Sequence, residues 1–293
     1  MSTAPPPDER AVALLSCPVC AARLQALPDA SGLGCAAGHR FDRARHGHVT
    51  LLPPGHRPPS ADSAEMVADR AAFLGAGHYA GLTAALADAV ADGGGPLPAT
   101  LLDLGGGTGH HLAGVLDRLP EAVGVVLDSS PYAARRAARA HPRAIAVVAD
   151  TWARLPIGDG VLDRVLVVFA PRNGPEIARV LRPEGRLVVV TPAADHLREL
   201  VGPLGLLRVD PDKAERMAAT LEPHLQPLGA TTHRSRLALD RASVETLVGM
   251  GPHARHLSRN ALVASLAALP EPVEVTVAVH LSTYGPSPTT PAG

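Results

Sequence analysis

The chain has 293 residues, of which 46% are hydrophobic and only 2% aromatic, and its formal net charge at pH 7 is −1. This length suits one large α/β domain with a small appendage, and the near-neutral balance excludes a protein that binds nucleic acid through a uniformly basic surface. No apolar run approaches the ~18 to 20 residues that span a bilayer, and the Pro-rich start lacks the pattern of a secretion signal. We therefore expect a cytoplasmic protein that does not contact membranes.

Three cysteines, the only ones in the chain, lie near its start. Cys17 and Cys20 form a Cys-x2-Cys pair, and Cys35 and His39 follow as a second pair of ligands. An odd number of cysteines offers no disulfide framework, whereas three thiolates and one imidazole suit a tetrahedral zinc ion. The spacing predicts a structural Zn²⁺ site with a closed set of four ligands. The alternative is three unrelated buried or redox cysteines.

The region around these ligands is locally basic. Arg40, Arg43 and Arg45 follow the last ligand closely. Arginines held by a rigid zinc module can clamp RNA phosphates, so we expect these three to bind RNA. The alternative is a solvated loop in an arginine-rich protein.

Two helices are expected after a Pro-rich stretch. Asp62 is the expected N-cap of the first, with Glu65 three residues later, and this helix ends near residues 75–79. The second covers residues 82–91 and is broken by the glycines that follow.

A glycine-rich turn follows the first apolar strand, residues 100–104. The glycines that follow Asp103 have the spacing Asp-x-Gly-x-Gly-x-Gly, with Gly105, Gly107 and Gly109. The dinucleotide-binding pattern would require a glycine at position 110, which is histidine. The turn therefore favours S-adenosylmethionine (SAM) over a dinucleotide. A glycine turn without a ligand is the alternative.

Aspartates end the next two strands, residues 123–127 and 145–149. Asp128 lies roughly 20 residues beyond the turn, where a carboxylate that binds a ribose diol is expected. Its alternative role is to cap the helix that begins near residue 131. Asp150 is expected to contact the adenine, and the alternative is an aspartate in a loop.

The remaining pattern alternates strand and helix. We expect strands at 161–169, 185–191, 231–239 and 273–282, and helices at 175–181, 195–200 and 211–225. The two late strands suit an antiparallel pair at the end of the sheet. We expect the fold class α/β, with a Rossmann-like class I SAM-dependent methyltransferase domain preceded by a small zinc-binding module.

The chain resembles the RlmA-type bacterial 23S ribosomal RNA (guanine-N1)-methyltransferases, in the Gram-positive branch that includes tylosin-resistance enzymes. The similarity covers nearly the whole chain. The zinc ligands, the glycine turn and the later motifs carry it, and these motifs are residues 38–42, 47–52, 62–66, 76–79, 169–173 and 196–197.

The resemblance implies further roles for individual residues. It implies that Tyr79, Gly107, Thr108 and His196 contact SAM, and it implies a homodimer. The residues alone favour other roles: Tyr79 as a core aromatic at a helix end, and His196 as an N-terminal helix residue satisfied by the backbone. The implied partner is 23S ribosomal RNA, methylated at a guanine N1 in a hairpin loop near the peptide exit tunnel, with macrolide resistance as an associated role.

The loop after the fourth strand is where the target base is expected to meet the methyl group. Phe169 is a candidate to stack on a flipped base, and Arg172 and Asn173 follow it. A core position at a strand end is the other reading of Phe169. The sequence does not identify a general base for this reaction.

The expected organisation has five parts: a disordered N-terminus (1–10), a zinc-binding RNA-recognition module (11–50), a linker (51–61), the SAM-dependent methyltransferase domain (62–285) and a tail (286–293). Two other functions stay open from the residues: a methyltransferase acting on a small molecule, and a non-catalytic protein that binds zinc and SAM.

Overall fold

The computed structural model describes residues 6–53, 55–56, 58, 61–92, 99–206, 219–251 and 259–287. Its helices are α1 (Glu9–Val12), α2 (Ala64–Gly75), α3 (Ala80–Ala91), α4 (His110–Arg118), α5 (Pro131–Ala137), α6 (Gly174–Val180), α7 (Arg198–Leu204), α9 (Arg241–Gly249) and α10 (Arg259–Ala267). Its strands are β1 (Leu24–Ala26), β2 (Gly32–Cys35), β3 (Arg40–Asp42), β4 (Val49–Thr50), β5 (Thr100–Leu104), β6 (Val123–Asp128), β7 (Ala144–Val148), β8 (Leu162–Val168), β9 (Leu181–Pro192), β10 (Leu225–Leu239) and β11 (Val273–Pro286).

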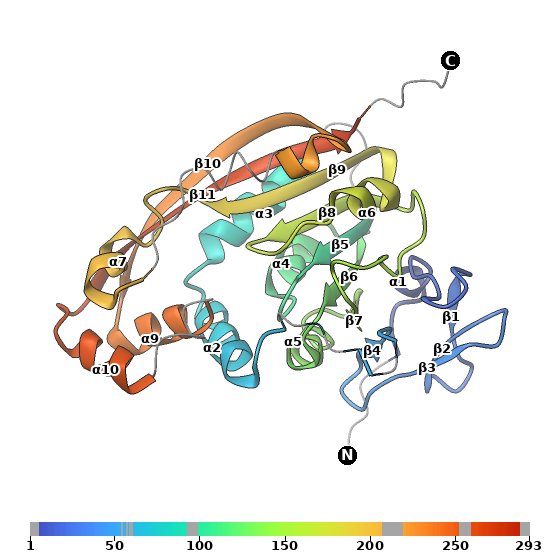
Figure 1. Ribbon diagram of the computed structural model, residues 1–293, viewed down its shortest axis with the longest axis horizontal. Coiled ribbons are helices and arrows are strands. Elements are labelled where there is room, and N and C mark those ends of the chain that lie inside the picture. The colour runs from blue at the N-terminus through green and yellow to red at the C-terminus, as the bar shows by residue number, and fades with distance from the viewer. Residues whose placement is uncertain are drawn as a thin grey trace.

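An eight-stranded sheet forms the centre of the molecule (Figure 1). Its order is β10-β11-β9-β8-β5-β6-β7-β4, and β11 runs antiparallel to both of its neighbours while the pairs from β9 to β4 are parallel. The central strands are buried on both faces, as their continuous apolar runs predict. The Rossmann-like class I fold is confirmed, with its antiparallel pair at one edge.

The sheet separates two hydrophobic cores. Leu101 of β5 belongs to the core that includes α3, α4 and α9, and the next residue, Leu102, belongs to the core on the other face with α1 and α6. This alternation follows from the two-residue period of a strand. Because β5, β6 and β8 are parallel, their carboxyl ends lie at the same edge of the sheet, and the loops that follow them meet there.

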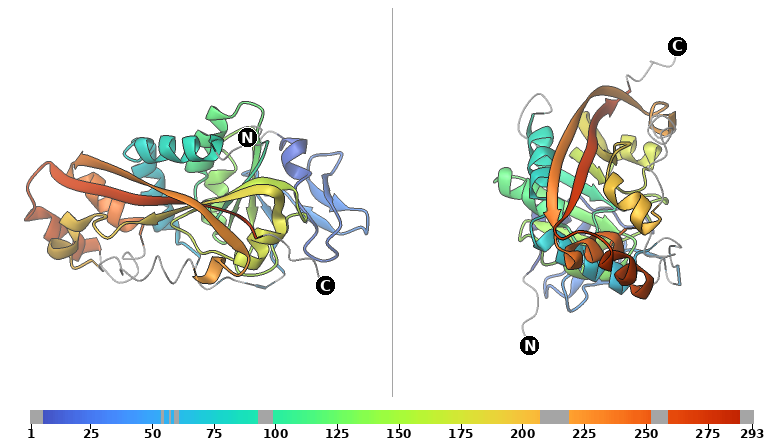
Figure 2. Two further views of the ribbon diagram at one scale, coloured as in Figure 1. Left: turned by 90° about the horizontal axis from the view of Figure 1, so that it is seen from above. Right: turned by 90° about the vertical axis from the view of Figure 1, so that its left-hand side faces the viewer.

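The zinc module lies at one end of an elongated molecule, and α7, α9 and α10 lie at the other (Figure 2). Between them, α2 packs against both α5 and α9. The three-stranded antiparallel sheet β1-β2-β3 carries the zinc module. Leu24 and Leu33 of this sheet are fully buried in the same core as β5 and β6, so the module is docked on the main domain.

The predicted division of the chain stays a prediction, but the structure differs from it at its boundaries. Glu9 and Arg10, expected to be disordered, belong to α1, which Asp8 caps. β4 and Leu51 join the main sheet beside β7, although the prediction placed them in the zinc module and the linker. Pro286 ends β11 rather than starting a tail, and residues 1–5 and 288–293 lie outside the described residues.

Three predicted elements are corrected. Ser63, not Asp62, is the N-cap of α2, because the Ser63 side chain accepts the Met66 N–H. The helix expected at 195–200 begins at Arg198 and continues to Leu204. Of the helix expected at 211–225, residues 211–218 lie outside the described part, and Leu225 already begins β10.

None of the helices in the described part of the chain is long and apolar enough to cross a membrane.

Candidate active site and zinc centre

The four predicted zinc ligands come together in the N-terminal module. The ligand atoms of Cys17, Cys20, Cys35 and His39 all lie within 4.8 Å of one another. His39 Nδ1 is 3.4 Å from the Cys35 sulfur and 3.5 Å from the Cys17 sulfur. Three sulfurs and one imidazole nitrogen in this cluster fit a tetrahedral Zn²⁺ ion, so the zinc prediction is confirmed by the donor set.

The cluster is held by two short turns. The Cys17 N–H donates to the Ala22 carbonyl, and the Ala21 N–H donates back to the Cys17 carbonyl, which closes the first turn. In the second turn, the Cys35 N–H donates to the His39 carbonyl. Desolvation opposes ionisation of Cys35, but hydrogen bonds from His39 lower the pKa of this thiol to about 6, which favours the thiolate that a metal requires.

The glycine turn has the conformation that its spacing predicts. Gly105, Gly107 and Gly109 have φ values of +71°, +55° and +76°, in the left-handed region that favours glycine. A Cβ at Gly105 would lie 2.5 Å from the Ala170 Cβ, and a Cβ at Gly106 would lie 2.6 Å from the Asp103 Cγ. The turn therefore packs too closely for side chains at these positions.

Asp128 ties this turn to the end of β6. Its Oδ2 accepts the Gly107 N–H at 2.9 Å, and its Oδ1 accepts the Ser130 N–H at 2.8 Å. Burial raises the pKa of Asp128, and these hydrogen bonds act against that rise. Ser130 caps α5 through its own side chain, so the carboxylate of Asp128 orients the turn instead of capping the helix.

Asp103 lies next to Gly106 of the turn, and its buried carboxylate lacks hydrogen-bond donors among the described residues. The residue is 1% exposed, and neither carboxylate oxygen accepts a hydrogen bond of normal geometry from the described residues. Burial, with a smaller contribution from Asp128, raises the pKa of Asp103 to about 7. A buried carboxylate without a donor is the feature expected where a ligand that carries a donor completes the site.

Arg70 of α2 lies over Gly107 of the turn, and no sequence motif pointed to this residue. Its Nη1 would lie 3.2 Å from a Cβ at Gly107 and is 2.5 Å from Asp62 Oδ2, and its Nη2 donates to the Met250 carbonyl at 2.9 Å. The Asp62 carbonyl in turn accepts the Ser130 hydroxyl at 2.8 Å. These contacts join α2, α9 and α5 over the glycine turn.

The loop after β8 lies against the same turn, through the contact of Ala170 with Gly105. Phe169 has a φ of +54° and is 42% exposed, which is strained backbone under a large apolar side chain. Its ring centroid is 5.8 Å from that of His196, with the two planes inclined by 32°. This pair forms an aromatic surface beside the turn.

His196 is neutral at physiological pH, because burial lowers its pKa to about 4. Its Nδ1 is 3.3 Å from the Ala278 N–H and accepts that hydrogen bond. The remaining hydrogen of the neutral ring is therefore on Nε2. Through Nε2 the ring can donate a hydrogen bond but cannot take up a proton.

The other predicted site residues are buried or have local partners. Tyr79 is buried and packs edge-on against Phe73 at 5.0 Å, and burial raises its pKa. Thr108 is buried within the turn. Asp150 Oδ2 is 2.9 Å from His56 Nε2, and its Oδ1 accepts the Trp152 N–H at 2.9 Å.

Arg172 and Asn173 occupy different positions from Phe169. Arg172 is partly buried, its Nε has no hydrogen-bond acceptor among the described residues, and desolvation lowers its pKa. The Asn173 amide donates to the carbonyls of Thr151 and Ala153, at 3.3 and 3.2 Å. Asn173 thus joins the loops after β7 and β8.

The three arginines that were predicted to bind RNA differ in their exposure. Arg40 and Arg45 are exposed, whereas Arg43 is partly buried, and its Nε donates to the Gly47 carbonyl at 3.1 Å. Arg43 therefore also stabilises the loop that carries Arg45.

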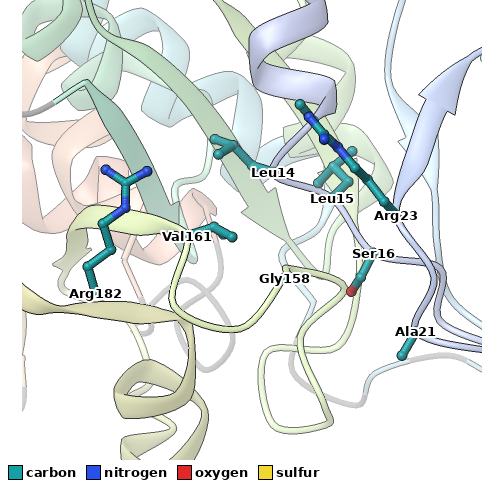
Figure 3. Close-up of a pocket in the computed structure, with 9 residues that line it drawn as sticks. Leu14, Leu15, Ser16, Ala21, Arg23, Gly158, Val161 and Arg182 are labelled. Atoms are coloured by element: carbon teal, nitrogen blue, oxygen red, sulfur yellow. The ribbon is translucent and has the colours of Figure 1, made fainter.

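A cavity of about 340 Å³ lies away from this site (Figure 3). Gly158 and Val161 line it and precede β8, so it opens at the amino ends of the parallel strands, opposite the glycine turn. Of its two arginines, Arg23 and Arg182, the latter is paired with Asp163.

Comparisons with known proteins match two separate parts of the chain. Residues 15–58 match the zinc-ribbon family described as "RlmA, N-terminal", and residues 102–189 match the family described as "Methyltransferase domain". A protein of Micromonospora griseorubida assigned as a 23S rRNA (guanine-N(1)-)-methyltransferase is 54% identical over 93% of this chain and 97% of its own length. The 23S rRNA (guanine(748)-N(1))-methyltransferase of Streptomyces fradiae is 48% identical over 94% of this chain and 98% of its own.

A more distant relative is YxjB of Bacillus subtilis, also assigned as a 23S rRNA (guanine-N(1)-)-methyltransferase. It is 32% identical over 64% of this chain and 67% of its own length. The zinc cluster, the glycine turn at the carboxyl end of β5 and these matches lead to one conclusion: the chain belongs to the family of SAM-dependent 23S rRNA (guanine-N1)-methyltransferases with an RlmA-type zinc ribbon.

Proposed function

We propose that this protein transfers a methyl group from SAM to N1 of a guanine in a hairpin loop of 23S ribosomal RNA. The observation that carries the proposal is the glycine turn in one chain with a zinc ribbon. Asp128 holds this turn, and the Asp103 carboxylate next to it accepts no hydrogen bond of normal geometry from the residues that the structure describes. The relative from Streptomyces fradiae is named for guanine 748, so we propose the corresponding hairpin as the target.

The residues proposed to hold the cofactor are those around the turn. SAM supplies a methyl group on a sulfonium, which is already a strong electrophile. Asp103 would accept a hydrogen bond from a donor of the cofactor, and Asp128 keeps lone pairs free for the ribose hydroxyls. The full proposed set is Tyr79, Asp103, Gly105, Gly107, Thr108, Gly109, Asp128, Asp150 and His196.

The chemistry on the RNA side is the attack of N1 on the methyl carbon. The N1 lone pair forms the new bond, the carbon–sulfur bond breaks, and the N1 proton leaves to solvent or to a base. Phe169 offers the exposed ring on which a flipped guanine would stack, and Arg172 and Asn173 complete that loop. His196 is not the base through Nε2, because that nitrogen carries a hydrogen; it can donate to the cofactor or to the guanine.

Primer extension on an RNA transcript of the 23S hairpin tests the proposal. Methylation at guanine N1 removes a Watson–Crick donor, so reverse transcriptase is expected to stop one nucleotide before the modified base. The stop should require both SAM and the protein. Methyl incorporation into a metabolite fraction with none into RNA would contradict the proposal and favour a small-molecule methyltransferase.

We further propose that the modification reduces macrolide binding in the exit tunnel, as the resemblance implies. Expression in a tylosin-susceptible host should raise the inhibitory concentration of tylosin. A variant that binds no SAM serves as the control, and equal susceptibility with active enzyme and control would overturn the resistance role.

A homodimer is also part of the proposal. β10 lies at the edge of the main sheet, and most of its residues are exposed, so its backbone edge is available for pairing. Light scattering at micromolar concentration should give twice the chain mass of 30.2 kDa. A single-chain mass would exclude the dimer.

A further inference from the structure

We infer that helix α5 extends the RNA-binding surface of the zinc ribbon, so that one basic track runs from the glycine-turn edge to the loop that carries Arg45. This inference rests on the proposed function and names which part of the main domain holds the RNA. The track consists of Tyr132, Arg135, Arg136 and Arg139 on α5 and the turn after it, with Arg45 and His46 on the ribbon.

The spacing on α5 places the side chains on one face. Tyr132, Arg135, Arg136 and Arg139 stand at positions i, i+3, i+4 and i+7, which share one side of a helix. All four residues are exposed, and Tyr132 is 51% exposed. The opposite side of α5, with Ala133, Ala134 and Ala137, is buried.

The α5 part and the ribbon part of the track meet at His46. Arg139 Nη2 is 3.1 Å from His46 Nδ1, and Arg45 Nη2 is 3.4 Å from His46 Nε2. Burial, and then the positive charges of Arg135, Arg45 and Arg139, lower the pKa of His46. The imidazole is therefore neutral at physiological pH and has one acceptor nitrogen, so it accepts a hydrogen bond from one of these two arginines and contacts the other.

The arginines of this surface have no carboxylate partner in the described part of the chain. Among the described residues, none of the four arginines Arg45, Arg135, Arg136 and Arg139 forms an ion pair with a carboxylate, whereas Arg10, Arg118, Arg154, Arg182 and Arg198 each do. Arginines that leave their charge unpaired suit the phosphates of an RNA backbone, which guanidinium groups bind in a forked geometry. This cluster makes one surface positively charged although the net charge of the whole chain is only −1.

The position of the track connects it to the chemistry. Ser130 caps α5 and also donates to Asp128 Oδ1, so the helix begins directly beside the glycine turn. From Tyr132 to Ala137 the helix rises about 7 to 8 Å, and the turn that follows it carries Arg139 to His46 of the zinc ribbon. Tyr132, at the end nearer the turn, offers a ring on which an unpaired base of the hairpin can stack.

The test compares two double variants with the wild type. R135A/R139A should bind the hairpin RNA more weakly, by 10-fold or more at moderate salt, and should reduce the slope of log Kd against log salt by about 1 to 2, because each lost phosphate contact removes roughly 0.7 to 0.9 from that slope. R135K/R139K keeps the charges and should keep most of the slope. SAM affinity and zinc content should be unchanged in both.

Two further variants separate the contributions. Arg118→Ala removes an exposed arginine that is paired with Asp88 and should leave RNA binding unchanged. Tyr132→Ala should weaken RNA binding without changing the salt slope, and Tyr132→Phe should restore the affinity.

The outcomes distinguish the inference from the function on which it rests. If the wild-type protein stops primer extension on the hairpin but R135A/R139A binds RNA with the same affinity and salt slope as R118A, then the inference is wrong and the function stands. If the wild-type protein neither binds nor methylates the RNA, the proposed function fails first.

Discussion

At the scale of single residues, the site depends on backbone that only a few side chains tolerate. Gly105 combines a φ of +71° with close contact to Ala170, so both conformation and space exclude a side chain there. Phe169 shows the opposite case, a bulky residue kept at positive φ beside the same turn. Strain of this kind is retained where function requires a particular side chain.

Gly105→Ala should destabilise the protein by about 1 to 2 kcal/mol from the backbone strain alone, with more from the contact to Ala170, and should weaken SAM binding. Gly75→Ala is the matched control, because Gly75 lies in α2 with no neighbour within 4 Å of an added Cβ. That change should stabilise the helix by roughly 0.5 to 1 kcal/mol. Thermal unfolding and SAM calorimetry on both variants check this, and equal SAM affinity in G105A would refute the close-packing argument.

Phe169→Ala and Phe169→Gly should both reduce methyl transfer while leaving the Kd for SAM unchanged, because the ring is assigned to the RNA base. The glycine variant should be more stable than the alanine variant by about 1 kcal/mol, since only glycine adopts the positive φ without strain. Full methyl transfer by either variant would remove the stacking role.

The raised pKa of Asp103 predicts a pH dependence with a definite sign. Ionisation is disfavoured in the folded protein, so the stability of the cofactor-free protein should fall as pH rises from about 4 to about 7, at about 1.4 kcal/mol for each unit of pKa shift. Asp103→Asn should remove this dependence and weaken SAM binding above pH 7. Identical pH profiles of Tm for wild type and variant would contradict the assignment.

At the scale of elements, the sequence predicts the strands of the main sheet well and their surroundings less well. The apolar runs of β5, β6 and β7 are visible because both faces of these strands are buried. β4 has only two residues, which are too few to show an apolar pattern in the sequence. Its place beside β7 depends on the docking of the whole zinc module. The boundary between module and domain could not be predicted for this reason.

The same limit applies to the site. The turn, its aspartates and the zinc ligands are local in sequence and were predicted. The cover by Arg70 and the pairing of Phe169 with His196 join segments far apart in the chain, so only the packed structure shows them. The basic residues of α5 and the turn after it have an i, i+3, i+4, i+7 spacing that the sequence shows. Only the contact of Arg139 with His46 shows that this face continues into the zinc ribbon.

Removal of zinc should affect both modules, because the ribbon shares its core with the main sheet. Cys35→Ser should lose the metal, lower the Tm and abolish RNA methylation. Val19→Ser is the matched control, since Val19 lies in the same knuckle but is 65% exposed. Elemental analysis and thermal unfolding check the pair; an unchanged Tm in metal-free C35S would show that the ribbon does not stabilise the domain.

At the scale of the whole molecule, the arrangement places the chemistry between a metal-stabilised ribbon at one end and a helical cover at the other (Figure 2). The cover of α2 and α9 meets the glycine turn through Arg70, and the ribbon meets α5 through His46. These two contacts connect both ends of the molecule to elements that lie beside the glycine turn.

The most direct measurement is nucleoside mass spectrometry of 23S rRNA after incubation with the purified protein and SAM that carries an isotopically labelled methyl group. We predict labelled 1-methylguanosine, confined to one hairpin and absent when SAM is omitted. Label in another nucleoside, or none in the RNA despite bound SAM and zinc, would contradict guanine N1 as the acceptor.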